Sequence, residues 1–393
     1  MTPGLACMTS ADADIVILGG GCAGLSLARR LATARCKARV IVVEPRSAYT
    51  DDRSWCFWAP SHDHAESHLV AQSWKQWRFS TLSGQTQTHE HPGMRYHYIR
   101  SQDFYDDACA RIASHDAIEM KMGVRAQDVR RDSERYLVET DQGVLSTNAV
   151  VDTRSLPGES PALLYQCFLG LEIAHPPLRP EQAHVAGLME AMDCDRDGFH
   201  FLYVLPLGSE RSLIEVTRFA QDRIDPETLR GQLDDQIIRL HGAATQCLRT
   251  ESGVLPMGLT HAIPATSGPQ HVYAGLAGGA LRPASGYAFQ RIQHWAEACT
   301  VSILSDRGVI GHPPEPMIRG LMDQVFLHAL RAEPRRGADF FMALAKRLSP
   351  DAFVRFMSDT ATFGDKVSVI SALPPAPFLK AVWTSVQDHK SAA

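Results

Sequence analysis

Three glycines and an acid near the start of the chain have the spacing of a site for a phosphorylated cofactor. Gly19, Gly21 and Gly24 follow an apolar run, and a helix pattern comes after them. Glycine allows a tight turn at the first position, a close approach to a pyrophosphate at the second, and close helix–strand packing at the third. Glu44, twenty residues beyond Gly24, ends a second apolar run. We predict a dinucleotide site in which Glu44 accepts a hydrogen bond from a ribose hydroxyl and repels the 2′-phosphate of NADP.

A second glycine-rich segment follows a short apolar strand late in the chain. Its residues that could contact a cofactor are Gly275, Gly278, Gly279, Arg282, Gly286 and Tyr287. In flavoproteins of the hydroxylase type, a late strand delivers such a turn and a helix start to the flavin. A helix that begins near Ser285 would direct its N–H groups and positive dipole end at the flavin ring. Two such turns far apart in one chain predict FAD as the cofactor.

Two kinds of element must position these turns. Residues 14–44 have a strand–helix–strand pattern, residues 136–138 and 149–152 are expected to return to the same sheet, and residues 272–274 form another short strand. By contrast, residues 199–206 and 212–217 alternate in hydrophobicity around a turn. This alternation predicts a hairpin in an antiparallel sheet.

Helical patterns dominate the remainder of the chain. They cover residues 287–306 and most of 317–373, whereas the Pro-Pro-Ala-Pro segment at 374–377 is expected to interrupt regular structure. We predict a mixed α/β fold like that of flavoprotein hydroxylases, with a Rossmann-type FAD-binding domain, an antiparallel-sheet substrate domain and C-terminal helices. The predicted FAD-binding domain is discontinuous and comprises residues 12–60, 100–158 and 268–312. The substrate domain comprises residues 61–99 and 159–267, and the helical region comprises residues 313–393.

Composition argues against several other classes of protein. The 393 residues carry a net charge of −5, so the chain lacks the basic surface of a nucleic-acid-binding protein. The nine cysteines form no C-x-x-C pair, which indicates a reducing cytoplasm rather than a disulfide framework. His62, His64 and His68 lack further ligands at suitable spacing, and no metal site is predicted. No run reaches the ~18 apolar residues of a membrane span.

Longer segments match one family from end to end of the chain. They are residues 14–24, 55–58, 151–154, 166–170, 192–193, 197–207, 213–217, 279–287 and 355–358. On these segments the chain resembles the bacterial lycopene β-cyclases, which are flavin-containing carotenoid cyclases. The hairpin that ends in Ile214, Glu215, Val216 and Thr217 is the most specific match, because generic flavin hydroxylases lack it.

The resemblance implies cyclisation of the ψ-ends of lycopene to β-ionone rings, which gives γ-carotene or β-carotene without net oxidation. It implies reduced FAD as the active cofactor, with NAD(P)H as the reductant. Glu215 matches the family's proton donor, whose pKa must be raised in a dry pocket. Protonation of a terminal alkene gives a tertiary carbocation, which an electron-rich flavin face can stabilise. From the strand pattern alone, a solvated carboxylate on an edge strand is the simpler interpretation of Glu215.

The resemblance also implies a hydrocarbon site and a membrane surface. Aromatic faces can stabilise a cation by roughly 0.5–2 kcal/mol each. The candidates to line the substrate are Trp55, Phe57, Trp58 and Tyr203. Lycopene resides in the bilayer, so we expect a peripheral protein at the cytoplasmic membrane that takes up the polyene through an apolar tunnel. The apolar C-terminal region could present the docking face or pack as core.

Two residues depart from the family pattern. Val216 stands where the family usually has a second acid, and Arg282 replaces the usual histidine of the glycine turn. Arg282 could pair with an anionic flavin or with a carboxylate, or be a surface charge. These departures leave open cyclisation of one or both ends, and another polyene or terpenoid as substrate. The sequence is also compatible with a redox flavoenzyme of the same fold, either a monooxygenase or a polyprenyl reductase, and with a carotenoid carrier.

Overall fold

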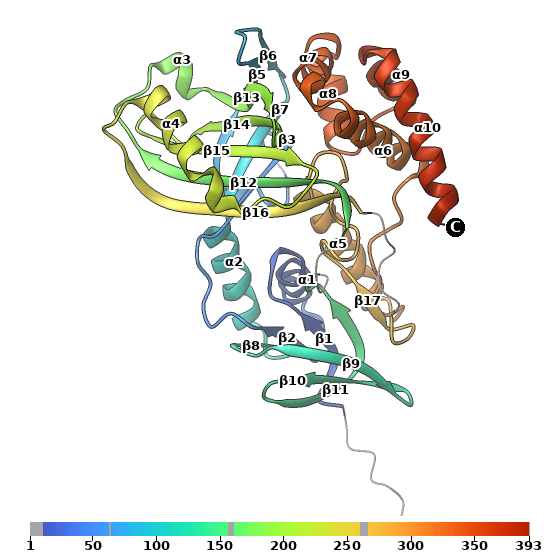
Figure 1. Ribbon diagram of the computed structural model, residues 1–393. Helices are drawn as coiled ribbons and strands as arrows, with labels where there is room; N and C mark the ends of the chain where they lie inside the picture. The colour runs from blue at the N-terminus through green and yellow to red at the C-terminus, as the bar shows by residue number, and fades with distance from the viewer. Residues whose placement is uncertain (1–10, 63, 156–160, 260–265, 393) are drawn as a thin grey trace, which may run out of the picture.

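The computed structural model describes residues 11–62, 64–155, 161–259 and 266–392. Figure 1 shows two large sheets, one above the other, with a group of C-terminal helices beside the upper one. This arrangement confirms the predicted mixed α/β class with a Rossmann-type sheet, an antiparallel sheet and C-terminal helices. The domain boundary expected at residues 158 and 159 lies outside the described residues.

The lower sheet in Figure 1 carries the first glycine turn. Its strand order is β8-β2-β1-β11-β10-β9, with β17 paired to β11. The strands β8, β2, β1, β11 and β17 run parallel, whereas β10 and β9 pair antiparallel at one side. The bounds are β1 (Ala13–Leu18), β2 (Val40–Glu44), β8 (Ile118–Met122), β9 (Ala126–Asp132), β10 (Arg135–Thr140), β11 (Gly143–Asp152) and β17 (His271–Tyr273). The central strand, β1, opens at its carboxyl end on the glycine turn, where open parallel sheets bind their ligands.

Side chains that alternate along β1 build a core on each face of the lower sheet. Ile15 and Ile17 pack under three helices, which are α1 (Cys22–Thr33), α2 (Ser101–Ala113) and α5 (Phe289–Leu304). Val16 and Leu18 point to the other face, where they pack with Val138 of the β9–β10 hairpin. Both faces of the parallel strands are therefore covered.

The upper sheet runs in the order β16-β12-β15-β14-β13-β5-β6. Neighbouring strands are antiparallel except β13 and β5. The bounds are β5 (Gln76–Thr81), β6 (Thr86–Glu90), β12 (Ala162–Ala174), β13 (Val185–Asp195), β14 (Gly198–Pro206), β15 (Arg211–Ala220) and β16 (Gln246–Leu259). The pair β14 and β15 confirms the predicted hairpin, whereas β16 was not predicted from the sequence.

The two faces of the upper sheet bury different side chains. Ile214 and Val216 pack on the outer face with α4 (Arg230–His241). Glu215, between them in the strand, therefore faces inward. The shorter elements near α4 and the sheet are α3 (Pro180–Ala183) and the 3-10 turn Pro226–Leu229.

A three-stranded sheet contributes to the cores of both large sheets. Its order is β3-β7-β4, with β3 (Ser54–Pro60), β4 (Val70–Trp74) and β7 (Met94–Arg100), and the 3-10 turn Ser67–Leu69 precedes β4. Trp58 and Tyr96 belong to the upper core, whereas Phe57 and Ile99 belong to the lower core. Because β3 pairs with β7, the domain boundary expected at residue 60 passes between two strands of one sheet.

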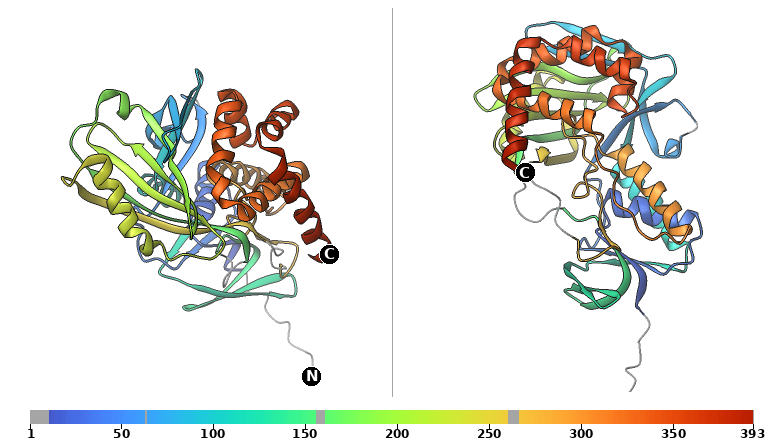
Figure 2. Two further views of the ribbon diagram at one scale, coloured as in Figure 1. Left: turned by 45° about the horizontal axis from the view of Figure 1, so that its top comes forward. Right: turned by 90° about the vertical axis from the view of Figure 1, so that its right-hand side faces the viewer.

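The C-terminal helices form a layer on the inner side of the upper sheet (Figure 2). They are α6 (Met317–Ala332), α7 (Gly337–Arg347), α8 (Pro350–Met357), α9 (Phe363–Ala372) and α10 (Pro375–Ala392), with a 3-10 turn at Pro334–Arg336. The helix α6 contacts β12 and β16, and α7 contacts β5, β6 and β13. The interruption expected at residues 374–377 is confirmed only at its start, because Leu373 and Pro374 separate α9 from α10, whereas residues 375–377 are helical. Pro375 is the first residue of α10, where a proline is tolerated because the first N–H groups of a helix have no partner within it.

Candidate active site

The first glycine turn leaves open space in front of the N-terminus of α1. Gly19 has a φ of 95°, and a Cβ at Gly24 would lie 1.9 Å from the Gly19 carbonyl oxygen. Both positions therefore require glycine. Gly21 directly precedes α1, and a Cβ built on it would meet no atom within 4 Å. Gly21 lines a cleft, in which the N–H groups of α1 can bind an anion.

Glu44 ends β2 and fixes the shape of this turn. Its buried carboxylate accepts hydrogen bonds from the Gly20 N–H at 2.7 Å and from the N–H and Nε of Arg46 at 2.9 and 2.7 Å. Arg46 lines the cleft, and its guanidinium forms an ion pair with this carboxylate. Arg46 is not among the predicted site residues, and its only signal in the sequence is its place two residues after the acid. A contact between Glu44 and a ribose stays a prediction.

The second glycine turn reaches the same cleft from β17. Gly275 and Gly286 have φ angles of 65° and 73°, and both line the cleft. Gly278 and Gly279 shape the turn between them. A Cβ at Gly278 would lie 2.5 Å from the Ala274 Cα, and Gly279 has a φ of 89°.

The helix expected to begin near Ser285 begins at Phe289 instead. The Gly286 N–H donates to the Arg282 carbonyl at 3.0 Å, and the positive φ of Gly286 does not fit an α-helix. Tyr287 follows this turn and lines the cleft. The turn itself, rather than a helix N-terminus, therefore faces the cleft at this point.

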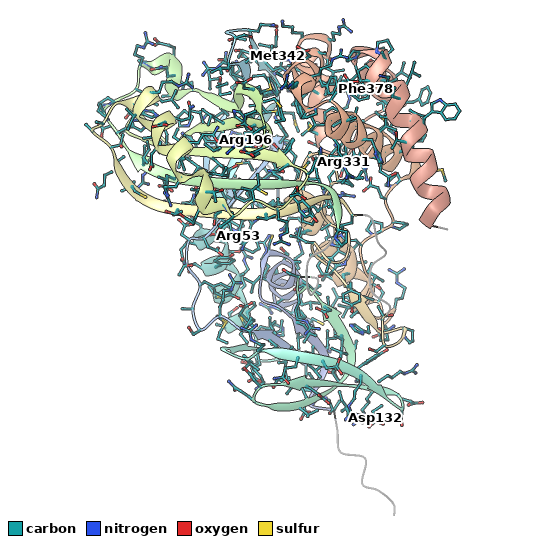
Figure 3. The ribbon with its side chains drawn as sticks, viewed as in Figure 1. Arg53, Asp132, Arg196, Arg331, Met342 and Phe378 are labelled. Atoms are coloured by element: carbon teal, nitrogen blue, oxygen red, sulfur yellow. The ribbon has the colours of Figure 1, made fainter. Side chains whose placement is uncertain are left out.

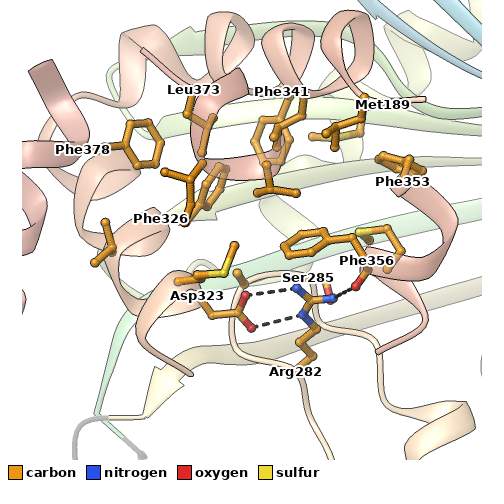
Figure 4. Close-up of a pocket in the computed structure, with 18 of the residues that line it drawn as sticks. Met189, Arg282, Ser285, Asp323, Phe326, Phe341, Phe353, Phe356, Leu373 and Phe378 are labelled. Carbon is orange, nitrogen blue, oxygen red and sulfur yellow. Dashed lines mark hydrogen bonds and ion pairs between the residues drawn. The ribbon is translucent and has the colours of Figure 1, made fainter. Parts of the chain in front are cut away.

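Arg282 points toward the C-terminal helices (Figure 4). Its Nε and Nη2 each lie 3.2 Å from a carboxylate oxygen of Asp323 on α6, and its Nη1 donates to the Phe356 carbonyl. The guanidinium also lies over the Phe356 ring, with 4.3 Å between Cζ and the ring centroid. From the sequence, Arg282 could pair with an anionic flavin or with a carboxylate, or be a surface charge. In the structure it pairs with a carboxylate, that of Asp323. Arg282 thereby connects the second glycine turn to α6.

The two glycine turns open into a cleft of about 460 Å³, the polar cleft, whose wall includes the charged side chains of Arg46 and Arg53. Arg53, one of its lining residues, lies between the two large sheets in Figure 3. The inner face of the upper sheet contributes Glu215 from β15 and Glu251 from β16. The cleft therefore brings the predicted proton donor to the same space as Gly21, Gly275 and Gly286.

Glu215 is buried, although it carries an ionisable group. Only 8% of its surface is exposed, and its Oε1 accepts a hydrogen bond from the Thr217 hydroxyl at 2.6 Å. Burial, and after it the nearby Glu251 carboxyl, raises the pKa of Glu215 to about 8. Glu215 is therefore not the solvated carboxylate that the strand pattern allowed.

Glu251 is a second buried carboxyl of the cleft, and neither this residue nor its strand β16 was predicted from the sequence. Its Oε2 accepts hydrogen bonds from Arg249 Nη1 and from the Ser54 hydroxyl, each at 2.7 Å. Burial raises the pKa of Glu251, and the Arg249 guanidinium opposes this effect. Its neighbours in β16 are largely polar, so no alternation of hydrophobicity marks the strand.

Of the four aromatic candidates, Tyr203 lies on β14 and the other three lie on β3, where alternation directs Trp55 and Phe57 to one face and Trp58 to the other. Trp55 lines the polar cleft and stacks on Phe289, with 5.5 Å between the ring centroids. Phe57 packs against the same ring within the lower core. Trp58 lines a second cavity, and Tyr203 lines both the cleft and that cavity.

The second cavity, of about 520 Å³, lies between the upper sheet and the C-terminal helices (Figure 4). Most of its wall is apolar, and the rings that Figure 4 labels are Phe326, Phe341, Phe353, Phe356 and Phe378. The cavity and the cleft share the lining residues Gln166, Tyr203, Ser285 and Tyr287. Tyr203 pairs with Glu215 across β14 and β15. The apolar cavity therefore meets the cleft beside the buried carboxyl.

The mouth of the apolar cavity opens among α6, α9 and α10. Leu321, Ile370, Leu379 and Val382 line the cavity and are also exposed to solvent. The same three helices expose Met317, Ile318, Phe363, Val367 and Trp383. In the described part of the chain, no helix has the length and apolar character needed to span a bilayer.

Curated proteins match this chain along nearly its whole length. Residues 14–382 match the family model described as lycopene cyclase protein. The chain is 24% identical to a lycopene beta-cyclase of Pantoea ananas over 397 residues, which cover 96% of this chain and 99% of that protein. It is 25% identical to a lycopene beta-cyclase of a Paracoccus species, over 94% of this chain and 96% of that protein.

Solved structures share the fold at lower identity. A geranylgeranyl bacteriochlorophyll reductase-like protein of Thermoplasma acidophilum has a TM-score of 0.59 at 14% identity, covering 94% of this chain and 98% of its own. The p-nitrophenol 4-monooxygenase of Pseudomonas putida has a TM-score of 0.55 at 14% identity, and the match covers 96% of this chain and 97% of that protein. Aklavinone-11 hydroxylase, solved with FAD and aklavinone, has a TM-score of 0.54 at 13% identity, and the match covers 90% of this chain and 70% of that protein. These likenesses confirm the predicted flavoprotein fold, and the match of the family model shows that the chain belongs to the lycopene cyclase family.

Proposed function

We propose that the protein is a lycopene β-cyclase, which converts the ψ-ends of lycopene to β-ionone rings and gives γ-carotene and β-carotene without net oxidation. The observation that carries the proposal is the buried Glu215 carboxyl at the place where the polar cleft meets the apolar cavity. A carboxyl that keeps its proton near neutrality beside a hydrocarbon site can protonate an alkene. Membership of the lycopene cyclase family supports lycopene, or a related polyene, as the hydrocarbon.

The cleft fits FAD, which we propose as the cofactor in its reduced form, with NAD(P)H as the reductant. Two observations support the fit. They are the open space in front of Gly21 and the Gln166 Oε1, a buried acceptor without a hydrogen-bond partner at the cleft wall. The N–H groups of α1 and the Arg46 guanidinium would hold the pyrophosphate. Reduced FAD, when bound, supplies an electron-rich ring face that stabilises positive charge on the hydrocarbon.

Glu215 performs both proton transfers of the proposed reaction. Its proton moves to the terminal alkene of the polyene, and positive charge forms on the tertiary carbon. The next double bond attacks this carbon and closes the ring, which moves the charge to a ring carbon. The Glu215 carboxylate then removes a proton from the adjacent ring carbon, so the product is an isomer of the substrate. Trp58, Tyr203 and Tyr287 exclude water from the junction and offer ring faces to the charge.

The polyene enters, in this proposal, from the cytoplasmic face of a membrane through the mouth of the apolar cavity. The exposed apolar side chains of α6, α9 and α10 surround that mouth. An exposed apolar patch of this kind is typical of a surface that binds a membrane or a partner. A hydrocarbon that leaves the bilayer there would stay out of water until it reaches Glu215.

Each part of the chain has one proposed task. Residues 12–60, 100–158 and 268–312 bind FAD. Residues 61–99 and 159–267 hold the substrate end against Glu215, and residues 313–393 enclose the apolar cavity and its mouth.

Expression of the chain in cells that accumulate lycopene tests the proposal. Chromatography should detect one-ring or two-ring carotenes with the wild type and only lycopene with Glu215→Gln. The purified wild-type protein should be yellow and release FAD on denaturation. If the wild type leaves lycopene unchanged and oxidises NAD(P)H in proportion to another product, the protein is a redox flavoenzyme instead. Full turnover by Glu215→Gln would assign the proton transfer to a different group.

A further inference from the structure

We propose that Glu251 is a positioning residue for the cyclisation, an ionised carboxylate that faces Glu215 across Gly170 and keeps the Glu215 carboxyl in its proton-carrying form. The inference rests on the function proposed above for Glu215. It depends on the geometry of three neighbouring strands, β15, β12 and β16.

Gly170 provides the space in which the two carboxyl side chains approach each other. It pairs with Glu215 of β15 on one side and with Glu251 of β16 on the other. The backbones of β15 and β16 are two strand spacings apart, which is about 9.5 Å. A Cβ at Gly170 would lie 3.2 Å from both the Glu215 Cβ and the Glu251 Cγ. Both side chains therefore lean over the glycine, into the space that a larger residue would fill.

The two carboxyls have different partners, and this difference decides which of them is charged. Glu251 accepts hydrogen bonds from the Arg249 guanidinium and the Ser54 hydroxyl. Glu215 accepts one from the Thr217 hydroxyl, and among the described residues Arg249 acts on it only from a distance, without an ion pair. A buried charge is tolerated when a cation and hydrogen bonds compensate it. Glu251 is therefore the charged member of the pair.

Repulsion between like charges then assigns the proton to Glu215. Two carboxylates that share a site with little water do not both ionise, because the repulsion between them is poorly screened. The pair holds one proton near neutrality, and its two ionisations are coupled. The pKa of Glu215, which burial and then Glu251 raise to about 8, agrees with this assignment.

The other groups around the pair do not change charge in the same range. The titratable side chains that face it are Cys56 on β3, Tyr96 and Tyr98 on β7, Tyr203 on β14, and Tyr287. Burial raises the pKa of each of them, so they stay neutral. The charged side chains nearby form one ion-pair network of Arg249, Arg100, Asp51 and Glu172. Among these described groups, we expect only the pair to exchange a proton with solvent or substrate near neutrality.

A residue next to Glu215 in the sequence cannot take the role of Glu251. Side chains alternate along a strand, and Val216 packs with Ile214 on the outer face under α4. The second acid of the cleft must therefore come from another strand. The strand β16 supplies it across the gap at Gly170.

The pH dependence of the purified holoenzyme tests the proposal. Lycopene is presented in phosphatidylcholine vesicles with chemically reduced FAD, and initial rates are measured against pH. The wild-type rate should fall as the pH rises through about 8, because Glu215 loses its proton. In Glu251→Gln the like charge is gone, so the fall should occur about one pH unit lower or more. Glu251→Asp keeps the charge, so its rate should fall at a pH closer to that of the wild type.

Two further measurements separate this role from a general effect on the fold. Glu172→Gln also removes a carboxylate that pairs with Arg249, but this carboxylate does not face Glu215. The dependence of its rate on pH should therefore match that of the wild type. An infrared titration can identify the band of the protonated Glu215 carboxyl, because Glu215→Gln lacks this band. In Glu251→Gln the band should disappear at a lower pH than in the wild type. An unchanged infrared midpoint in Glu251→Gln would overturn the proposal. A shifted midpoint in a protein that never cyclises lycopene would instead overturn the proposed function and leave the carboxyl pair established.

Discussion

At the scale of single residues, the site contains ionisable groups that are buried in pairs. Glu215 lies beside Glu251 in the cleft, and Arg282 lies beside Asp323 behind the second glycine turn. A buried ionisable group is unfavourable unless it stays neutral or contacts an opposite charge. Glu215 stays neutral, whereas Arg282 has a carboxylate partner. Substitution of the two residues should therefore affect stability in opposite directions.

Glu215→Gln should remove a pH dependence of stability. The pKa of Glu215 rises from 4.5 to about 8 on folding, so between these values the folded protein binds more protons than the unfolded chain. The stability that Glu215 contributes therefore falls as the pH rises from about 4.5 to about 8. At about pH 8.5, Glu215→Gln should be more stable than the wild type by on the order of a few kcal/mol, whereas at about pH 4 the two should agree. Urea denaturation at both pH values checks this, and an equal difference at both would contradict it.

Arg282→Met should destabilise the fold by about 3–5 kcal/mol, because it leaves a buried carboxylate without a cation. Asp323 is 2% exposed, so water cannot replace the guanidinium. The double variant Arg282→Met, Asp323→Leu should recover much of the loss, since an apolar pair of similar volume is tolerated there. Thermal denaturation measures both effects. Loss of bound FAD from Arg282→Met at unchanged stability would show instead that the guanidinium serves the cofactor.

At the scale of elements, local signals determine what a sequence can predict. The first glycine turn and the β14–β15 hairpin have fixed spacings or alternating hydrophobicity, and both are found where expected. The strand β16 contains Gly253, Pro256 and Gly258, which interrupt any alternation, and its support comes from a long pairing with β12. Glu251 could not be predicted for the same reason. Its relation to Glu215 exists only because β12 lies between their strands.

The first glycine turn offers a matched pair of substitutions that separates folding from cofactor binding. Gly24→Ala should destabilise the apoprotein, because the new methyl group would lie 1.9 Å from the Gly19 carbonyl oxygen. Gly21→Ala places its methyl group in open space within the cleft, so the apoprotein should keep its melting temperature. The same methyl group should lower FAD affinity at least about tenfold by blocking the close approach of a pyrophosphate. Flavin fluorescence titration and apoprotein melting curves check both variants. A Gly21→Ala protein that binds FAD like the wild type would place the pyrophosphate elsewhere.

At the scale of the whole molecule, two cavities of different character meet at one carboxyl. The polar cleft lies between the large sheets, and the apolar cavity lies between the upper sheet and the C-terminal helices. The sequence could predict the helices but not the cavity, because an apolar residue in a helix can face a core or a surface. Phe340 is fully buried, whereas Trp383 is 76% exposed. Only the packing of five helices against one another and against the sheet separates these two cases.

The exposed apolar residues at the cavity mouth should bind the membrane. Phe363, Val367 and Trp383 are 76%, 49% and 76% exposed, and none of the three lines the apolar cavity, so changing all three to serine should hardly affect folding. Transfer of each side chain into the bilayer is worth about 1.5–3 kcal/mol, so even partial insertion predicts a loss of at least about tenfold in vesicle co-sedimentation.

The matched control changes Leu82 and Val144 to serine. These side chains are 55% and 56% exposed but lie outside α6, α9 and α10, so the control variant should sediment with vesicles like the wild type. With lycopene dispersed in detergent, the mouth variant should regain wild-type turnover, because Glu215 and the cleft are unchanged. Equal co-sedimentation of the mouth and control variants would mean that the membrane meets another face. Equal loss of turnover in vesicles and in detergent would mean that these three residues act on the cavity itself rather than on docking.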